Sequence, residues 1–115
     1  MPDLQHAYCY FLEDDKFVDT ERPGFRRRVV TGDHLQMCFW RIAGGATGSF
    51  LHHHAENEQL GMVLRGSIRF RVGAEERNLG PGETWEIPSK TPHRAEAGPD
   101  GATVLDIFAP PRSEW

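Results

Sequence analysis

Residues 49–72 read SFLHHHAENEQLGMVLRGSIRFRV, and this stretch decides the fold. Its second half alternates apolar and polar side chains at the two-residue period of a half-buried strand. Gly66 interrupts the alternation with a turn signal, because glycine adopts a positive φ at little steric cost. We therefore expect one strand over 59–65 and another over 67–72, preceded by a strand over 49–54.

The same pattern of short alternating runs continues on both sides of this stretch. Further strands are expected over 35–42, 77–79, 84–87, 92–97 and 102–109. Twelve glycines and eight prolines break the chain into such runs. Nothing between Gly24 and Pro110 shows a sustained helical period with caps. The sequence predicts an all-β domain, built as a barrel or a sandwich.

Length and charge narrow the possible functions. A chain of 115 residues forms a single domain. Thirteen Lys and Arg against 17 Asp and Glu give a formal net charge of -4, which offers no broad basic surface for nucleic acid or anionic lipid. We interpret the dense basic run at 26–28 as the solvated edge of a strand. Neither nucleic acid nor membrane is expected among the partners.

The cysteines and the amino-terminal segment indicate the compartment. Cys9 and Cys38 form no CxxC pair, and a disulfide-stabilised scaffold needs more cysteines than two. Residues 1–18 carry acids and aromatics in place of the basic start and apolar run of a signal peptide. We expect a cytoplasmic protein with an arm, residues 1–23, packed on the main domain or on a partner, and a main domain over 24–115.

Three consecutive histidines begin the segment that carries chemistry. Because side chains alternate along a strand, His52 and His54 project from one face and His53 from the other. Two imidazoles on one face have the arrangement of metal ligands. A histidine run on an exposed strand is the other interpretation, and this segment alone leaves both open.

The spacing that follows resembles the first motif of the cupin superfamily: glycine, five residues, His-x-His, three or four residues, glutamate, six residues, glycine. Four residues after His54 and six before Gly66 both lead to Gln59, which takes the place of the glutamate. Glu58 satisfies one of the two counts, but a strand turns it away from the face of Gln59. Ala46 stands where the motif opens with glycine.

The second cupin motif follows at the expected distance. It reads glycine, five residues, Pro-x-Gly, two residues, histidine, three residues, asparagine. Gly82, Pro88 and His93 match it, whereas Lys90 replaces the inner glycine and Ala97 the asparagine. The resemblance therefore rests on ordered spacing across both motifs.

This resemblance, over about residues 44–109, implies a single-domain cupin, which is a jelly-roll barrel or double-stranded β-helix, with the cupin domain at 24–115. It also implies one divalent transition metal ion: zinc, nickel, iron, manganese or cobalt. The implied metal ligands are His52, His54, Gln59 and His93. Because all four are neutral, the bound ion would keep its full charge and attract anions.

The carboxy-terminal run VLDIFAPPRSEW, residues 104–115, supplies the remaining candidates. Alternation alone favours Asp106 on the solvent side of its strand. The run is similar, however, to the end of small cupins of the pectin-degradation group, which ketonise unsaturated uronates. That resemblance implies a pocket in which Arg112 grips the substrate carboxylate, Asp106 moves a proton and Phe108 packs on the sugar. A surface arginine near the chain end is the other interpretation of Arg112.

The function implied is a metal-dependent isomerase or lyase acting on a small anionic sugar, in a homodimer, since small cupins are commonly dimers. One alternative is a metal-dependent dioxygenase. Another is a polyketide cyclase with a larger aromatic pocket, which would be lined by Phe39, Trp40, Phe50 and Trp85. A third is a cupin that binds a sugar or anion without turning it over.

Overall fold

The computed structural model of the protein describes residues 16–46, 56–113 and 115. The strand expected over 49–54 and the histidines at 52–54 lie outside the described residues. Within these residues the chain forms strands and no α-helix, which confirms the all-β prediction. The strands are β1 (Val18–Asp19), β2 (Phe25–Thr31), β3 (Gln36–Ile42), β4 (Glu58–Val72), β5 (Glu75–Leu79), β6 (Thr84–Ile87) and β7 (His93–Ala109).

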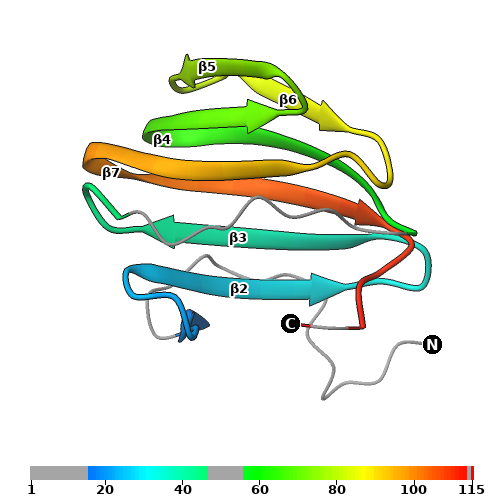
Figure 1. Ribbon diagram of the computed structural model, residues 1–115. Helices are drawn as coiled ribbons and strands as arrows, with labels where there is room; N and C mark the ends of the chain where they lie inside the picture. Colours follow the sequence, from blue (N-terminus) through cyan, green and yellow to red (C-terminus); the bar gives the residue numbers. More distant parts are fainter. Residues whose placement is uncertain (1–15, 47–55, 114) are drawn as a thin grey trace.

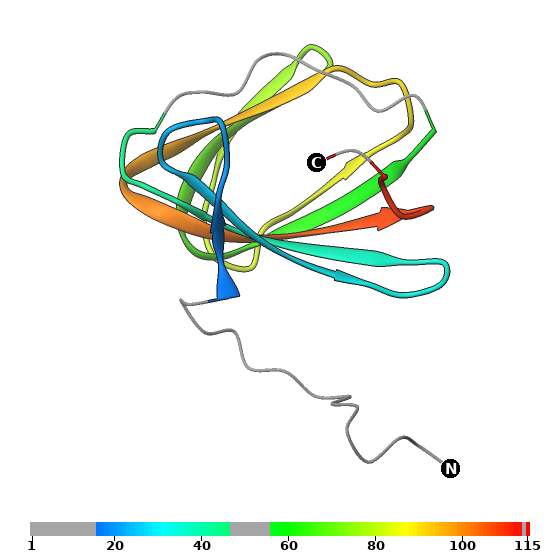
Figure 2. The same cartoon turned by 90° about the horizontal axis from the view of Figure 1, so that it is seen from below.

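The strands of the described residues belong to one antiparallel sheet. Its order is β1-β2-β3-β7-β4-β5, and β6 pairs with β4. Figure 1 shows β2, β3 and β7 running side by side, with β5 and β6 beyond β4. Turned by 90°, the sheet is seen to curl round into a barrel (Figure 2). This is the barrel that the sequence predicts.

A bend takes the place of the strand break expected at Gly66. β4 continues through this residue, and β7 likewise joins the strands expected over 92–97 and 102–109. Gly66 has a φ of 73°, and a Cβ on it would lie 2.0 Å from the carbonyl oxygen of Gly101. Glycine is required there because other residues rarely adopt this φ and their Cβ would clash with β7. The pairing of β4 with β7 continues on both sides, with an irregularity in its register.

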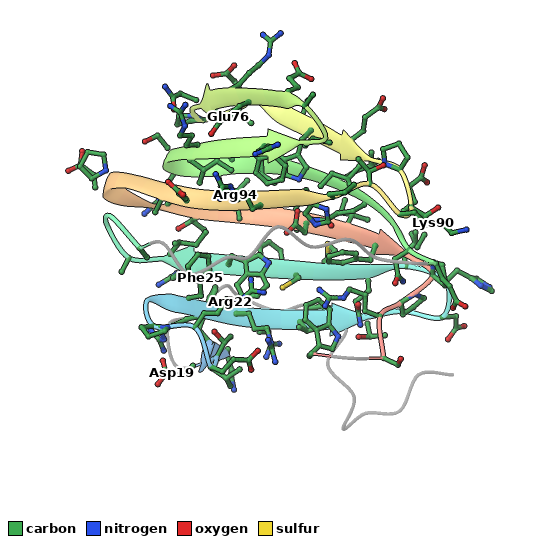
Figure 3. All side chains as sticks on the ribbon, in the orientation of Figure 1. Asp19, Arg22, Phe25, Glu76, Lys90 and Arg94 are labelled. Carbon is green, nitrogen blue, oxygen red and sulfur yellow. The ribbon has the colours of Figure 1, made fainter. Side chains whose placement is uncertain are left out.

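Side chains that point into the barrel form rows across β3, β7 and β4, because these strands are paired in register. Along the strands the rows are Gln36–Phe108–Gln59, then Cys38–Asp106–Gly61, then Trp40–Val104–Val63. The first two rows contain buried polar groups, and we call them the polar end. The third row leads into the hydrophobic core, which we call the apolar end. Its buried members include Phe25, which is labelled in Figure 3, and Ile42, Val63, Ile68, Ala102 and Val104.

Part of the expected amino-terminal arm is described. Phe17 is buried, and β1 pairs with β2 at its edge. The division of the chain between residues 23 and 24 stays a prediction. No helix of the described residues is long and apolar enough to cross a membrane.

Candidate active site

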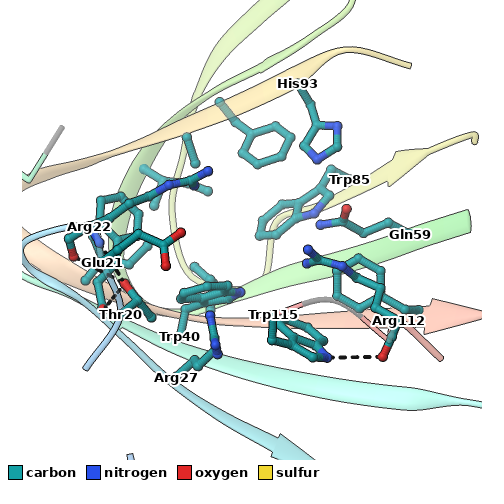
Figure 4. A pocket seen from close by; sticks show the side chains of 17 residues that line it. Thr20, Glu21, Arg22, Arg27, Trp40, Gln59, Trp85, His93, Arg112 and Trp115 are labelled. Atoms are coloured by element: carbon teal, nitrogen blue, oxygen red, sulfur yellow. Dashed lines mark hydrogen bonds between the residues drawn. The ribbon is translucent and has the colours of Figure 1, made fainter. Parts of the chain in front are cut away.

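A pocket lies inside the barrel and is open to solvent. It is lined at the polar end by residues such as Gln59 and toward the apolar end by residues such as Ile42 and Val104. Its wall takes Gln59 from β4, Trp85 from β6 and His93 from β7, as Figure 4 shows. Phe108 of β7 also lines it. Arg112 adds a guanidinium from the segment after β7. Four of the residues expected at the site are therefore brought together: Gln59, His93, Phe108 and Arg112.

His93 begins β7, and its imidazole is held in one orientation. The ring is buried, with Nδ1 2.9 Å from the carbonyl oxygen of Thr91. A carbonyl accepts hydrogen bonds only, so Nδ1 carries the proton and donates it, and Nε2 keeps its lone pair. The ring of Phe70 lies nearly parallel to the imidazole, with 6.4 Å between the ring centres. This is the tautomer that a metal-ligating histidine requires.

The Gln59 amide is oriented by a carboxylate. Gln59 is buried on β4, and its amide nitrogen donates to the side chain of Asp106. Its Oε1 is also buried and accepts no hydrogen bond from the described residues. A buried acceptor without a hydrogen bond destabilises the folded state by about 1–3 kcal/mol unless a ligand or an ion satisfies it. In Figure 4 the Gln59 and His93 side chains turn toward the same part of the pocket.

These two atoms fit a divalent transition metal ion. An imidazole nitrogen with its lone pair in place and an amide oxygen without a donor are the mixed nitrogen and oxygen ligands that such ions accept. His52 and His54, the other two expected ligands, lie outside the described residues. Across the parts of the chain that the structure describes, no group of three or more His, Cys, Asp and Glu side chains is placed to hold a metal. The four-residue ligand set stays a prediction.

Asp106 lies inside the barrel, so the interpretation of alternation that placed it toward solvent is wrong. Its side chain is 7% exposed and sits behind the pocket wall. Trp85 Nε1 donates to Oδ1 at 3.1 Å, and the side chains of Gln59 and Trp40 also donate to the carboxylate. Burial raises the pKa of Asp106 to about 6, while these donors and the charge of Arg112 oppose the rise. A carboxyl of that pKa exchanges protons readily near neutral pH.

Gly61 makes room for the Trp85 indole. A Cβ on Gly61 would lie 2.3 Å from Trp85 Nε1, the atom that donates to Asp106. On its other side the indole stacks on Phe70 at 4.7 Å between ring centres. Sequence reasoning missed Gly61, although an isolated glycine within a strand pattern is a signal for close approach.

Arg112 is fixed by its backbone as well as by ring contacts. Its amide nitrogen donates to Oε1 of buried Gln36 at 2.9 Å, and Gln36 Nε2 donates back to its carbonyl at 3.3 Å. The guanidinium lies 5.1 Å from the Phe108 ring centre and 4.2 Å from that of Trp115. The interpretation of Arg112 as a surface arginine is therefore wrong. Sequence reasoning missed Gln36, because no local pattern indicates a contact with a residue so distant in the chain.

Further differences from the expected site concern arginines and aromatics. Arg27 lines the pocket, as does Arg22, so the solvated-edge interpretation of the run at 26–28 is wrong for Arg27. Its inward direction follows from the register that pairs it with Trp40. Of the aromatics suggested for a larger pocket, Trp40 and Trp85 line it, Phe39 does not, and Phe50 lies outside the described residues.

Several known proteins are similar to this chain in sequence or in structure. The family model described as Cupin domain matches residues 38–108. The chain is 27% identical over 107 residues to the pectin degradation protein KdgF of Dickeya dadantii (strain 3937), covering 92% of this chain and 96% of that protein. The structure of KdgF from Halomonas sp. superposes with a TM-score of 0.80 at 29% identity, covering 91% of this chain and 96% of that one.

A third relative supports the fold alone. It is an RmlC-like cupin from Shewanella frigidimarina, with a TM-score of 0.82 at 24% identity, covering 94% of this chain and 95% of that one. The match to each of these relatives extends over nearly the whole of both chains.

Proposed function

The chain belongs to the cupin family, and from that premise we propose that it acts in the breakdown of pectin-type polymers. The proposed activity is a metal-dependent isomerisation that opens the ring of a 4,5-unsaturated uronate and converts the resulting enol to a ketone. The likeness to the pectin degradation protein KdgF, in sequence and in structure, supports this substrate class.

One observation carries the proposal. The Gln59 amide donates to the carboxylate of Asp106 and turns its buried oxygen to the pocket, where His93 also faces. The Gln59 side chain thus contacts the proposed proton carrier, Asp106, through its amide nitrogen, and its amide oxygen is an acceptor suited to a cation. We propose that His52, His54, Gln59 and His93 hold the metal ion. When bound, the ion would act as a Lewis acid toward a substrate oxygen.

The remaining side chains bind the substrate and move its proton. The Arg112 guanidinium is planar and matches a carboxylate with two parallel hydrogen bonds, and Phe108 beneath it presents an apolar face to the sugar. The anomeric hydroxyl loses a proton as the bond from C1 to the ring oxygen breaks, and C4 gains one. We assign both transfers to Asp106, relayed by water because its side chain lies behind the pocket wall. The balance is an isomerisation, so no co-reactant is consumed.

The test is turnover of a 4,5-unsaturated uronate, followed by loss of the ultraviolet absorbance of its double bond. Protein as purified, protein stripped with a chelator and protein reloaded with each candidate metal would be compared. We expect the stripped sample to lose activity and at least one metal to restore it. Absorbance loss no faster than in buffer for every sample would overturn the proposal.

Oxygen uptake in the same assay separates the proposal from a dioxygenase. An isomerisation consumes none, because no atom is added to the sugar. Oxygen consumption that matches substrate loss would favour the dioxygenase, and binding of the uronate without any loss of absorbance would favour a cupin that only holds its ligand.

A further inference from the structure

Two arginines in the pocket have no part in the proposed reaction. Figure 4 shows Arg22 and Arg27 on the side of the pocket opposite Gln59 and His93. Within residues 16–46, 56–113 and 115, no hydrogen bond or ion pair is formed by either guanidinium. Cations that face a cavity without a carboxylate partner are groups that a ligand anion would satisfy.

The turn between β1 and β2 is built so that Arg22 reaches over the pocket. Thr20 Oγ1 accepts from the Arg22 amide at 3.2 Å and donates to the Phe25 carbonyl at 2.8 Å. The Phe25 amide donates in turn to the Arg22 carbonyl at 3.1 Å. Both backbone groups of Arg22 are therefore fixed, and the buried Phe25 ring anchors the turn to the core. The backbone of this turn is therefore ordered before a ligand binds, and binding has to order only the Arg22 side chain.

Arg27 is held by aromatic faces. Its guanidinium carbon lies 6.0 Å from the ring centre of Trp40 and 5.2 Å from that of Trp115. Arg112 lies 4.2 Å from the same Trp115 ring, so the two charges are less than about 10 Å apart, the Debye length at 0.1 M salt. Contact with a ring face leaves the N–H groups at the guanidinium edge available for an anion.

Charge around the pocket is unbalanced even before a metal is counted. Three guanidinium groups, from Arg22, Arg27 and Arg112, face two carboxylates, Glu21 on the wall and Asp106 behind it. Burial lowers the pKa of Arg112, and the charges of Arg27 and Arg22 lower it further, against the opposing effects of Cys38 and Asp106. One substrate carboxylate at Arg112 would balance this count, but the Arg22 and Arg27 guanidinium groups would still have no hydrogen-bonded anion within the described residues.

The reaction limits where a second anionic group can sit. Ring opening needs a free anomeric hydroxyl, so the group cannot belong to another sugar attached there. It has to be an ester on one of the remaining ring hydroxyls, and the esters that bring a negative charge are sulfate and phosphate. Both present tetrahedral oxyanions that accept hydrogen bonds from a guanidinium group.

We propose that Arg22 and Arg27 form a second anion subsite, which selects unsaturated uronate monosaccharides that carry a sulfate or phosphate ester in addition to the carboxylate. This rests on the proposed function for the place of the carboxylate. The subsite itself depends only on the two arginines and the walls that hold them.

Calorimetric titration with saturated uronates, which lack the reacting double bond, tests the subsite without turnover. The ligands are a plain uronate, its sulfate ester and its phosphate ester. We expect the wild-type chain to bind one of the esters at least about 10-fold more tightly than the plain acid, as hydrogen bonds between charged groups allow. The preferred ester identifies the oxyanion. Equal binding of all three ligands would overturn the proposal.

Variants assign that preference to residues. Arg22→Gln and Arg27→Gln should each lower the ratio of ester to plain affinity about 10-fold. Glu21→Gln should raise it, because a negative charge beside Arg22 is removed. Arg65→Gln, an exposed arginine of β4 outside this pocket, is the control and should leave the ratio unchanged. A fall in the ratio as large in Arg65→Gln as in Arg22→Gln would contradict the subsite.

The same ligands in unsaturated form keep the two proposals distinct. Preference for an ester without any turnover would contradict the proposed function and leave the subsite standing. Turnover of the plain uronate without any preference for an ester, in either titration or rate, would contradict the subsite alone.

Discussion

The polar and apolar ends of the barrel are made by the same three strands, yet they differ in what they bury. At the apolar end Val63 and Val104 are paired across β4 and β7, and both are buried and apolar. Two residues further along the same strands, Gly61 faces Asp106, and the neighbouring pair is Gln59 and Phe108. Polarity changes along the strands and not only across the sheet, so alternation identifies the inward face without indicating which end of it carries chemistry.

The comparison also separates stability from activity. Burying Val63 and Val104 removes apolar surface from water and stabilises the fold. Burying Asp106 raises its pKa and costs free energy in the ionised form, which three donors only partly offset. A protein retains such a group where its chemistry needs it, so changes at the two ends should have different consequences.

The largest contrast is expected between Asp106→Ala and Val63→Ala. Loss of the proton carrier should lower turnover of the unsaturated uronate about 1,000-fold. Val63→Ala should leave turnover within about threefold of wild type and lower the free energy of unfolding by about 2 kcal/mol, because a fully buried side chain leaves a cavity. Initial rates and denaturant unfolding of both variants measure this. Comparable turnover in the two variants would assign Asp106 to structure.

Part of the difference between the polar and apolar ends can be predicted from the amino-acid sequence, and part cannot. The resemblance to the spacing of the two cupin motifs led to Gln59 and His93, and both line the pocket. Alternation failed for Asp106, since a period of two cannot say which face is inward when one face carries an acid among apolar groups. The inward direction of Arg27 was missed because three consecutive arginines show no alternation.

Contacts between distant strands were beyond sequence reasoning altogether. Gly61 is required only because the Trp85 indole crosses β4 at that position, and Gln36 matters only because the chain after β7 returns to it. Neither contact has a local signature. A glycine within a strand pattern is equally consistent with a bend and with a break between two strands. The sequence therefore predicts a break at Gly66, where the structure has a bend.

A medium effect is expected for Gly61→Ala. The new Cβ would displace the Trp85 indole from Asp106, so turnover should fall about 10-fold and stability by about 1–3 kcal/mol. Gly80→Ala is the matched control, since a Cβ there would lie 3.7 Å from its nearest neighbour, the Glu83 carboxylate. Trp85 fluorescence and initial rates would follow the change. Identical rates for the two alanine variants would show that the indole position does not matter.

A smaller effect is expected at Gln36. Gln36→Leu removes both hydrogen bonds to the Arg112 backbone, so the guanidinium should lose its fixed position. We expect KM for the uronate to rise about 5-fold while kcat changes less, because binding of the carboxylate is affected and the proton transfer is not. Gln36→Glu, which keeps the acceptor for the Arg112 amide, should recover part of the loss. A fall in kcat at constant KM would contradict a positioning role.

The metal content of three variants tests the central claim most directly, that one set of side chains at the polar end holds an ion while another moves the proton. Elemental analysis after loading and dialysis should find about one ion per chain in the wild-type protein, the stoichiometry of a single four-ligand site. His93→Ala and Gln59→Ala should lose most of it, whereas Asp106→Asn, which keeps an oxygen to accept from the Gln59 amide, should keep it. Full metal content in His93→Ala, or its loss in Asp106→Asn, would contradict this division.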